Sequence, residues 1–380
     1  MTAGADPDRL DDEDALQRHD GGAMLRQVAT SGAQVREAEL AAEEAGLSAL
    51  AAEGRPRAVV VAGLGGSGIA GDVLAAVCGT GCPVPVLTVR SYTLPGWVGA
   101  ADLVVAVSCS GSTEETLAVA GEAVRRGCRL VTVGATESPL AGLPGRGGAP
   151  HVPVRSVGQP RASLWALSVP LLVLARELGL AEVPDGTLEA TAQRLDDLSH
   201  RCRPSSESFV NPAKELALEL AGSVPLAWGS TPLAGVAAYR FACQLAENAK
   251  YPALSGTLPE SNHNQVVCFD GTFVPGPSGV EDLFRDRVEE PVGETTLRLL
   301  VLRDTEEHPQ VARRCEASLS LAGERGVPAR TVAAEGEHRL ERLASLIGLV
   351  DYASVYLALL LGIDPTPVTA IEELKSRIAQ

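Results

Sequence analysis

Two stretches of this chain alternate short apolar runs with longer segments of helical composition. The first begins at Arg57–Val77 (RAVVVAGLGGSGIAGDVLAAV), which reads in the order strand, glycine loop, helix. Further strand-like runs are PVPVLTVRSY, DLVVAVS and RLVTVGA in the first stretch, and VPLAWGS, TLRLLVLRD and PARTVAAEG in the second. Strands that alternate with helices at this spacing indicate βαβ units and parallel sheets. The sequence therefore predicts an α/β fold of two doubly wound parallel-sheet domains.

The chain of 380 residues has the length expected for two domains of ordinary size. Residues 1–50 read as a polar N-terminal arm followed by a helix rich in Ala, Glu and Leu. We place the first sheet domain at 51–190 and the second at 205–380, with a polar connecting segment between them.

Charge and hydropathy exclude several classes of function. The net charge of -16 argues against nucleic acid or an anionic membrane as a partner, because both require a basic surface. The N-terminus has neither the basic nor the apolar region of a signal peptide. The apolar stretch 343–362 contains Asp351 and small polar residues, which favours a buried helix over a membrane span. Eight cysteines without CxxC spacing indicate reduced thiols, and we expect a cytoplasmic protein.

The first glycine loop, Gly63–Gly68, matches the G-x-G-x-x-G pattern of dinucleotide-binding domains. That class of site places an acidic residue at the end of the next strand, where it binds the ribose. Here the next strand ends in Arg90. An arginine can bind a 2′-phosphate, so this residue weakens the dinucleotide hypothesis without excluding it.

A second loop, Ser108–Thr113 (SCSGST), follows a strand and opens a helix. The amides and the positive dipole end of a helix N-terminus attract a phosphate dianion, and hydroxyl groups can donate to it. The alternative is helix capping, for which serine and threonine are common. Capping uses one hydroxyl, and four are present, so we favour phosphate binding. The four hydroxyls belong to Ser108, Ser110, Ser112 and Thr113.

The pair GLGGSGIAGD and SCSGSTEETL resembles the sugar isomerase (SIS) domain. The resemblance implies that a phosphate binds at Gly66, Ser67, Ser108, Ser110 and Thr113. Two positions depart from the usual pattern, which has an aromatic residue at Cys109 and an asparagine at Ser112. Neither departure removes a matched hydroxyl.

Glu247 and His263 have the side chains that an aldose–ketose isomerisation requires. A carboxylate can carry a proton between C2 and C1 through an enediol, and a histidine titrates near neutrality and can open the sugar ring. On the residues alone, a solvated helix face is the simpler interpretation, because Glu247 shares a polar side of the helix with Arg240 and Gln244. Glu247 could also simply pair with Lys250 three residues later. Glu260, close to His263, is a second candidate base.

Several separated motifs resemble the bifunctional phosphoglucose/phosphomannose isomerase family, whose members have two SIS domains. The resemblance runs from about Val59 to the C-terminus. It rests on Glu247–Lys250, Pro259–Glu260, Asn262–Asn264, Gly158–Arg161, Asp351–Tyr356, Ile363–Val368 and Leu374–Lys375.

Four catalytic roles follow from this resemblance. It implies that Glu247 is the base and that His263 opens the ring, on the substrate of the neighbouring subunit in a homodimer. It also implies that Arg161 stabilises the enediolate and that Lys375 reaches the substrate. The last two residues could instead have no catalytic role, since Arg161 could be a surface residue after a turn and Lys375 could pair with Glu372.

The sequence thus predicts an isomerase that interconverts glucose 6-phosphate, and mannose 6-phosphate as well, with fructose 6-phosphate. We expect no cofactor and no metal, because no HxH or HExxH motif is present. Thr366 and Thr369 are candidates for the residue that tolerates both C2 epimers. The alternative is a SIS protein that binds a sugar phosphate and regulates a partner without catalysis. A glucosamine-phosphate synthase lacks support, because Thr2, not the cysteine nucleophile, follows Met1.

Overall fold

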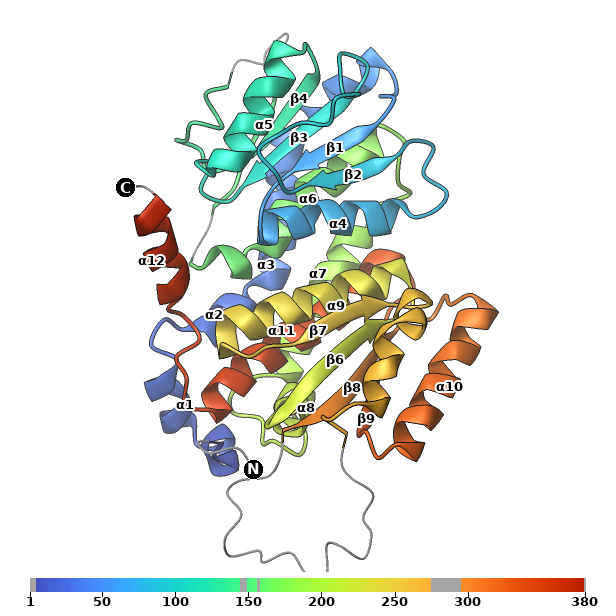
Figure 1. The fold of residues 1–380 in the computed structure, drawn as a ribbon. Helices are drawn as coiled ribbons and strands as arrows, with labels where there is room; N and C mark the ends of the chain where they lie inside the picture. Colours follow the sequence, from blue (N-terminus) through green and yellow to red (C-terminus); the bar gives the residue numbers. More distant parts are fainter. Residues whose placement is uncertain (1–4, 144–148, 156–157, 275–294, 379–380) are drawn as a thin grey trace, which may run out of the picture. The chain divides into compact units, whose positions relative to one another are not determined.

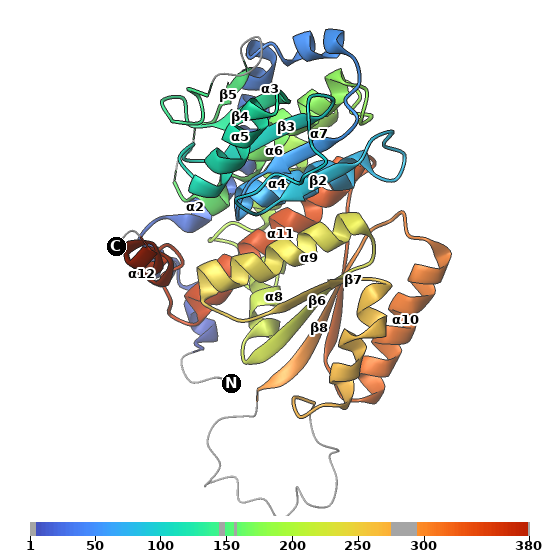
Figure 2. The same cartoon turned by 45° about the horizontal axis from the view of Figure 1, so that its top comes forward.

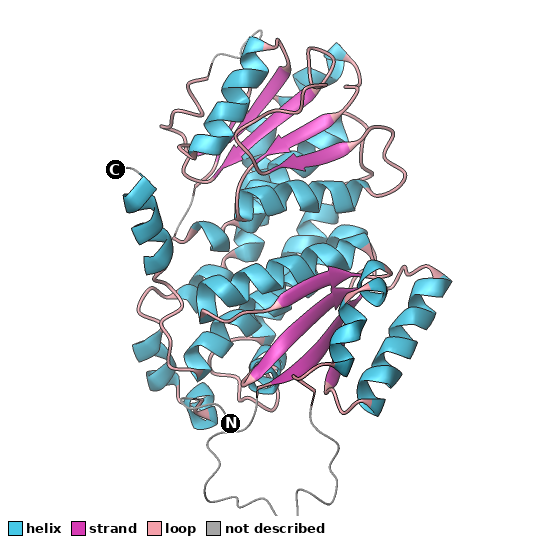
Figure 3. Cartoon of the chain, viewed as in Figure 1, coloured by secondary structure: helices cyan, strands magenta, loops and turns pink. Residues whose placement is uncertain are grey.

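The computed structural model describes residues 5–143, 149–155, 158–274 and 295–378. The chain divides into two compact units, each with one parallel sheet (Figures 1 and 3). We call Ala29–Asp196 with Glu337–Glu341 the first-sheet unit. The remainder, Met1–Val28, Asp197–Gly336 and Arg342–Gln380, is the second-sheet unit. The predicted fold class of two parallel-sheet α/β domains is confirmed.

The sheet of the first-sheet unit has the strand order β2-β1-β3-β4-β5, with every described pair parallel. β1 and β3 are buried throughout, as expected of strands covered on both faces. The strands are β1 (Val59–Ala62), β2 (Val86–Val89), β3 (Leu103–Ser108), β4 (Arg129–Gly134) and β5 (His151–Pro153).

Helices cover the faces of this sheet. Val119, Ala120 and Ala123 of one helix, α5, pack on Val60 and Val104. Figures 1 and 2 show α4 and α6 on the other side of the strands from α5. The helices are α3 (Ser31–Glu44), η2 (Leu47–Glu53), α4 (Gly66–Cys78), α5 (Glu114–Arg125), η3 (Pro160–Ala162), α6 (Leu164–Glu177) and α7 (Thr187–Arg201), which leads into the second-sheet unit.

The sheet of the second-sheet unit has the parallel order β7-β6-β8-β9. Trp228 and Phe269 stack in the core on one face, where Cys315 and Ala322 of α10 also pack. The strands are β6 (Ser223–Gly229), β7 (Leu254–Thr257), β8 (Thr296–Arg303) and β9 (Ala329–Ala333). The helices and turns are η1 (Pro7–Asp11), α1 (Glu13–His19), α2 (Met24–Ala29), α8 (Pro212–Leu220), α9 (Pro232–Gln244), η4 (Leu245–Ala249), η5 (Glu260–His263), η6 (Gln265–Asp270), α10 (Pro309–Glu324), α11 (Arg339–Leu360) and α12 (Thr369–Ile378).

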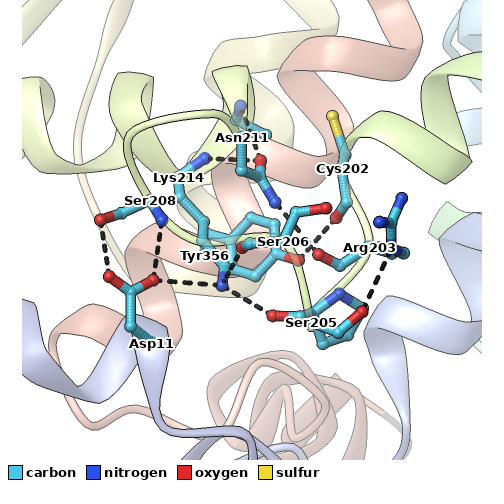
Figure 4. A network of polar contacts seen from close by, with 11 residues as sticks. Asp11, Cys202, Arg203, Ser205, Ser206, Ser208, Asn211, Lys214 and Tyr356 are labelled. Atoms are coloured by element: carbon cyan, nitrogen blue, oxygen red, sulfur yellow. Dashed lines mark hydrogen bonds and ion pairs between the residues drawn. The ribbon is translucent and has the colours of Figure 1, made fainter.

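Residues 1–50, which we expected to form one arm, are divided between the two units. Residues up to Val28 belong to the second-sheet unit, and Ala29 onward belongs to the first-sheet unit. Asp11 accepts hydrogen bonds from the backbone and hydroxyl of Ser208, at 2.8 and 2.7 Å (Figure 4). The single helix that we expected here is interrupted after Ala29 and again at Gly46, which has a positive φ of 68°.

The long apolar stretch forms α11, a helix of 22 residues whose most apolar window of 18 residues has a mean hydropathy of 1.8. By length and composition alone, among the described residues, it is the one helix that could cross a membrane. However, 94% of its most apolar window is buried, and its residues Arg342–Leu360 belong to the second-sheet unit. The expectation of a buried helix is therefore confirmed.

Candidate active site

The hydroxyls of the Ser108–Thr113 loop bond mainly to one another. Ser108 Oγ lies 2.8 Å from Thr113 Oγ1 and 3.5 Å from Ser110 Oγ. The Ser112 hydroxyl donates to Ser110 Oγ at 3.0 Å. Thr113 occupies the N-cap position of α5, yet its side chain makes no capping hydrogen bond. The capping alternative therefore fails for Thr113, and the cluster stands at the N-terminus of a helix, where an anion is favoured.

Glycines set the close packing of the two loops in the first-sheet unit. Gly111 has a positive φ of 65°, and a Cβ there would collide with the Ser138 side chain. A Cβ on Gly66, at the start of α4, would lie 3.6 Å from the Pro160 carbonyl oxygen and 4.0 Å from Arg161 Cα. The backbone of Arg161 therefore runs beside the glycine loop. Ser67 lies one residue further along the same helix and is 7% exposed.

The two arginines near this loop have different surroundings. Arg161 is buried, and its Nη1 donates to Gln159 Oε1 at 3.1 Å, so the alternative of a surface residue is wrong. Arg90, which a dinucleotide 2′-phosphate would need, forms an ion pair with Asp72 of α4. This ion pair engages the one side chain at the end of β2 that could have bound a 2′-phosphate, which weakens the dinucleotide hypothesis further.

Glu247 lies in a π-helical turn that extends α9. The turn, Leu245–Ala249, closes with a hydrogen bond from the Lys250 amide to the Leu245 carbonyl. Glu247 itself is partly buried. Sequence reasoning predicted an uninterrupted helix here and missed the π turn. Such turns occur frequently at functional sites.

A buried polar network joins this turn to α11. Arg240 donates to both carboxylate oxygens of Asp351, at 2.8 and 2.7 Å, and Gln244 donates to Oδ1 at 3.2 Å. Asn248 Nδ2 donates to Ser354 Oγ at 2.9 Å. Burial raises the pKa of Asp351, which the Arg240 guanidinium opposes. The side chains of Arg240, Gln244 and Asn248 are therefore hydrogen-bonded in the interior and do not form a solvated helix face.

His263 ends a short 3-10 turn, η5, whose neighbours are anchored. Asn262 Nδ2 donates to Ser318 Oγ of α10 at 2.8 Å, and Asn264 Nδ2 donates to Glu260 Oε1 at 2.8 Å. The His263 side chain is exposed. The flanking asparagines thus fix the backbone of the loop while the imidazole faces outward. Glu260, the second candidate base, holds this loop through Asn264.

Lys375 lies on α12, a helix with no buried residue. The apolar residues Ile371, Leu374 and Ile378 of this helix are 42, 58 and 70% exposed. Thr366 precedes α12 and lies against Gly22 of the N-terminal segment, whereas Thr369 begins the helix.

The predicted site residues thus fall into two groups. Gly66, Ser67, Ser108, Ser110, Thr113 and Arg161 lie in the first-sheet unit, and Glu247, His263 and Lys375 lie in the second-sheet unit. Sequence reasoning missed the roles of Asn248 and Asp351, because their partners lie far away along the chain. Within the described ranges, no three His, Cys, Asp or Glu side chains gather as a metal site would require.

Comparison with known proteins gives the same family for both parts of the chain. Residues 209–378 match the family model of the bacterial phospho-glucose isomerase C-terminal SIS domain. A bifunctional phosphoglucose/phosphomannose isomerase of Caldicellulosiruptor bescii is 36% identical, over 85% of this chain and 89% of its own length. One from Aquifex aeolicus is 30% identical, over 85% and 90%.

Solved structures support the fold. A hypothetical protein from Thermus thermophilus superposes with a TM-score of 0.67 at 16% identity, covering 97% of this chain and 94% of that one. At this identity the likeness shows the fold alone. It agrees with an arrangement of two parallel sheets.

Proposed function

The chain belongs to the bifunctional phosphoglucose/phosphomannose isomerase family, and from that premise we propose how its two groups of residues divide the reaction. It is an aldose–ketose isomerase that interconverts glucose 6-phosphate and mannose 6-phosphate with fructose 6-phosphate. The observation that carries the division is the position of Glu247. Glu247 lies on a π turn whose next residue, Asn248, is held by a buried hydrogen bond, while the hydroxyl cluster stands at a helix N-terminus in the other unit.

The first-sheet unit binds the substrate phosphate in this proposal. Ser67, Ser108, Ser110 and Thr113 donate hydrogen bonds, with the α4 and α5 amides, to the phosphate oxygens. Gly66 allows the backbone to approach the ligand. Arg161, beside that glycine, stabilises the negative charge of the enediolate. These residues bind and orient the sugar without a cationic cluster.

The second-sheet unit moves the protons. His263 transfers a proton between the ring oxygen and the C1 hydroxyl, which opens the ring. The Glu247 carboxylate then removes the C2 proton to give a cis-enediol and returns a proton to C1. Proton exchange between the two oxygens completes the change from aldehyde to ketone. Lys375 contacts the substrate from α12.

The two C2 epimers can share this mechanism because C2 is planar in the enediol. Glucose and mannose 6-phosphate give the same intermediate, and the face that is reprotonated decides the product. Thr366 or Thr369 would allow the rotation about C2–C3 that the second epimer needs. The alternative of a regulatory SIS protein would require neither Glu247 nor His263, and the comparisons offer it no support.

We propose further that the protein acts as a cytoplasmic homodimer. The exposed side chain of His263 supports this proposal. Its loop is anchored through Asn262, so the imidazole can reach a substrate only where one is bound next to this exposed surface. In the dimer that substrate is bound by the partner subunit. Light scattering should therefore show a dimer. A monomer with full activity would refute the proposal that His263 acts on substrate bound by the partner subunit.

A coupled assay on purified protein tests the proposed function. It should measure the conversion of glucose 6-phosphate and mannose 6-phosphate to fructose 6-phosphate, with EDTA present. We expect both activities to survive the chelator, since the scheme moves only protons. Activity on neither sugar phosphate contradicts the function. Activity that EDTA abolishes and zinc restores contradicts the proton-transfer mechanism.

A further inference from the structure

Lys250 closes the π turn that carries Glu247, and its backbone conformation is unusual. Its φ of 54° lies in the left-handed region, where only Ala23 joins it among the described residues other than glycine. Glycine and asparagine normally occupy such a position at a helix end, because a side chain there is strained. The shape of the turn therefore does not explain why a lysine occupies this position, and the contacts of its side chain offer an explanation.

The ammonium of Lys250 connects two segments that are far apart in the sequence. Nζ donates to the carbonyl oxygens of Glu247 and Asn248, at 2.9 and 3.2 Å. It also donates to the carbonyl oxygens of Asp364 and Pro365, at 3.2 and 3.3 Å. The second pair belongs to the loop between α11 and α12. One cation thus joins the backbone of the π turn to the segment that follows α11.

The loop on the far side of this bridge is itself supported. Thr366 N donates to Asp364 Oδ1 at 2.9 Å. Gly21 and Gly22, from the N-terminal segment, lie so close to Asp364 and Thr366 that a Cβ on either glycine would crowd them. Asn248 already holds the other side of the turn, through Ser354 of α11. Glu247 is therefore held between two anchors, of which Lys250 provides one.

We propose that Lys250 is a positioning residue for the proposed base: its ammonium clamps the backbone of the Glu247 turn to the 364–365 loop and so fixes the carboxylate for C2 proton transfer. The inference rests on the proposed function. It assigns Lys250 no contact with the substrate. A carboxylate displaced by about 1 Å can lose up to roughly 100-fold in rate, because proton transfer depends strongly on geometry.

Lys214 is a matched control in the same unit. Its Nζ also donates to backbone carbonyl oxygens, those of Pro204 and Ser206, each at 2.7 Å (Figure 4). Lys214 is buried beside the Tyr356 ring and Asp11, and burial lowers the pKa of its ammonium. It binds a loop that carries none of the site residues. Loss of the Lys214 ammonium should therefore reduce stability and leave the rate constant of folded enzyme unchanged.

The experiment compares kcat, KM and melting temperature for Lys250→Met, Lys250→Gly, Lys250→Arg and Lys214→Met, with glucose 6-phosphate as substrate. Lys250→Gly favours the left-handed backbone and removes the ammonium together with its aliphatic stem, so it remains informative if Lys250→Met folds poorly. We expect Lys250→Gly to lose roughly 10–100-fold in kcat with KM nearly constant. Lys250→Arg should recover part of the loss, and Lys214→Met should show a lower melting temperature at normal kcat.

A double-mutant cycle separates positioning from general damage. If Lys250 acts through the Glu247 carboxylate, Lys250→Gly should add little to the loss already caused by Glu247→Gln. Wild-type activity in Lys250→Gly, or full additivity with Glu247→Gln, overturns the inference and leaves the proposed function standing. A wild-type protein without isomerase activity overturns the proposed function and this inference together.

Discussion

The two sheets share one topology but use their central loops differently. The order β2-β1-β3-β4 in the first-sheet unit corresponds to β7-β6-β8-β9 in the second-sheet unit. The loop after β1 is the glycine loop, and the loop after β3 carries the hydroxyl cluster around Ser108. The loops after β6 and β8 carry Ser230 and Asp304, which are 1 and 7% exposed. Both pairs of loops lie at the carboxyl ends of parallel strands, where ligands of α/β folds usually bind.

In the second-sheet unit a carboxylate and its counter-ion occupy this position. Arg342 Nε donates to Asp304 Oδ1 at 2.7 Å, and the Thr231 hydroxyl donates to Oδ2 at 3.2 Å. The Asp304 amide donates to Ser230 Oγ at 2.9 Å. In the second-sheet unit the Asp304 carboxylate therefore occupies the loop position at which the first-sheet unit has hydroxyls that bond to one another. A shared topology does not imply a second phosphate site, and in our proposal the second-sheet unit has its base, Glu247, in the π turn at the end of α9 instead.

The largest expected effect tests the chemistry of the second-sheet unit. Glu247→Gln keeps the shape of the side chain but removes the base, so kcat for glucose 6-phosphate should fall on the order of 10²–10⁴. Substrate affinity should change little, because the hydroxyl loop belongs to the other unit. Single-turnover kinetics with NMR detection of C2 hydrogen exchange in deuterated water measures both. Exchange at the parent rate would move the base elsewhere, with Glu260 as the next candidate.

The next prediction asks whether the Asp304 loop is structural. Asp304→Ala removes one carboxylate from the buried Arg342 guanidinium, whose Nη2 also pairs with Glu306 at 2.7 Å. Because this second pair remains, the loss of folding free energy should fall below the roughly 3–5 kcal/mol that breaking an isolated buried pair costs. Urea unfolding should show this loss, and the double variant Asp304→Ala/Arg342→Met should recover part of it. KM for both sugar phosphates should stay within about twofold. A raised KM at unchanged stability would mean that this loop binds substrate and that the comparison between the sheets is wrong.

Most strands were predictable because they are short apolar runs between helical or turn segments, whereas the short edge strands β5 and β7 were missed. Val59–Ala62 and Leu103–Ser108 are buried at every position, and their short length and valine content favour a strand over a helix. The hydroxyl loop was predictable for a similar reason, since its residues are contiguous in the sequence. Local composition therefore identified most of the strands and the candidate phosphate site.

Features that depend on distant partners were not predictable. Arg240 and Gln244 looked like a solvated face because Asp351, which they bind, is more than a hundred residues away. The π turn, Leu245–Ala249, is only five residues long, which is too short to be recognised from the spacing of apolar residues. Residues 1–50 are divided between the units because contacts such as that of Asp11 with Ser208 hold residues up to Val28 in the second-sheet unit.

A smaller effect is expected from His263, which acts before the carbon proton moves. His263→Ala should lose about 100-fold on the cyclic sugar, the lower end of the range for a general acid–base group. The variant should retain much more activity on an open-chain substrate, because that form bypasses ring opening. Stopped-flow assays on the two forms measure the difference. Equal impairment on both would deny His263 this role and leave Glu247 as the one proposed proton-transfer group of the second-sheet unit.

The smallest expected effect concerns the hydroxyls of the first-sheet unit, and it separates the phosphate hypothesis from helix capping. Ser110→Ala removes one hydrogen bond to a charged group, worth about 1.5–3 kcal/mol, so KM should rise at least about tenfold. Ser112→Ala is the matched control, because the exposed Ser112 hydroxyl donates to Ser110 Oγ and is not a proposed ligand. Inhibition by inorganic phosphate should weaken in parallel with KM for Ser110→Ala and remain near the parent value for Ser112→Ala. Equal effects of the two substitutions would assign phosphate binding to the backbone amides of α5. The hydroxyl cluster would then organise the loop, much as the Asp304 pair does in the second-sheet unit.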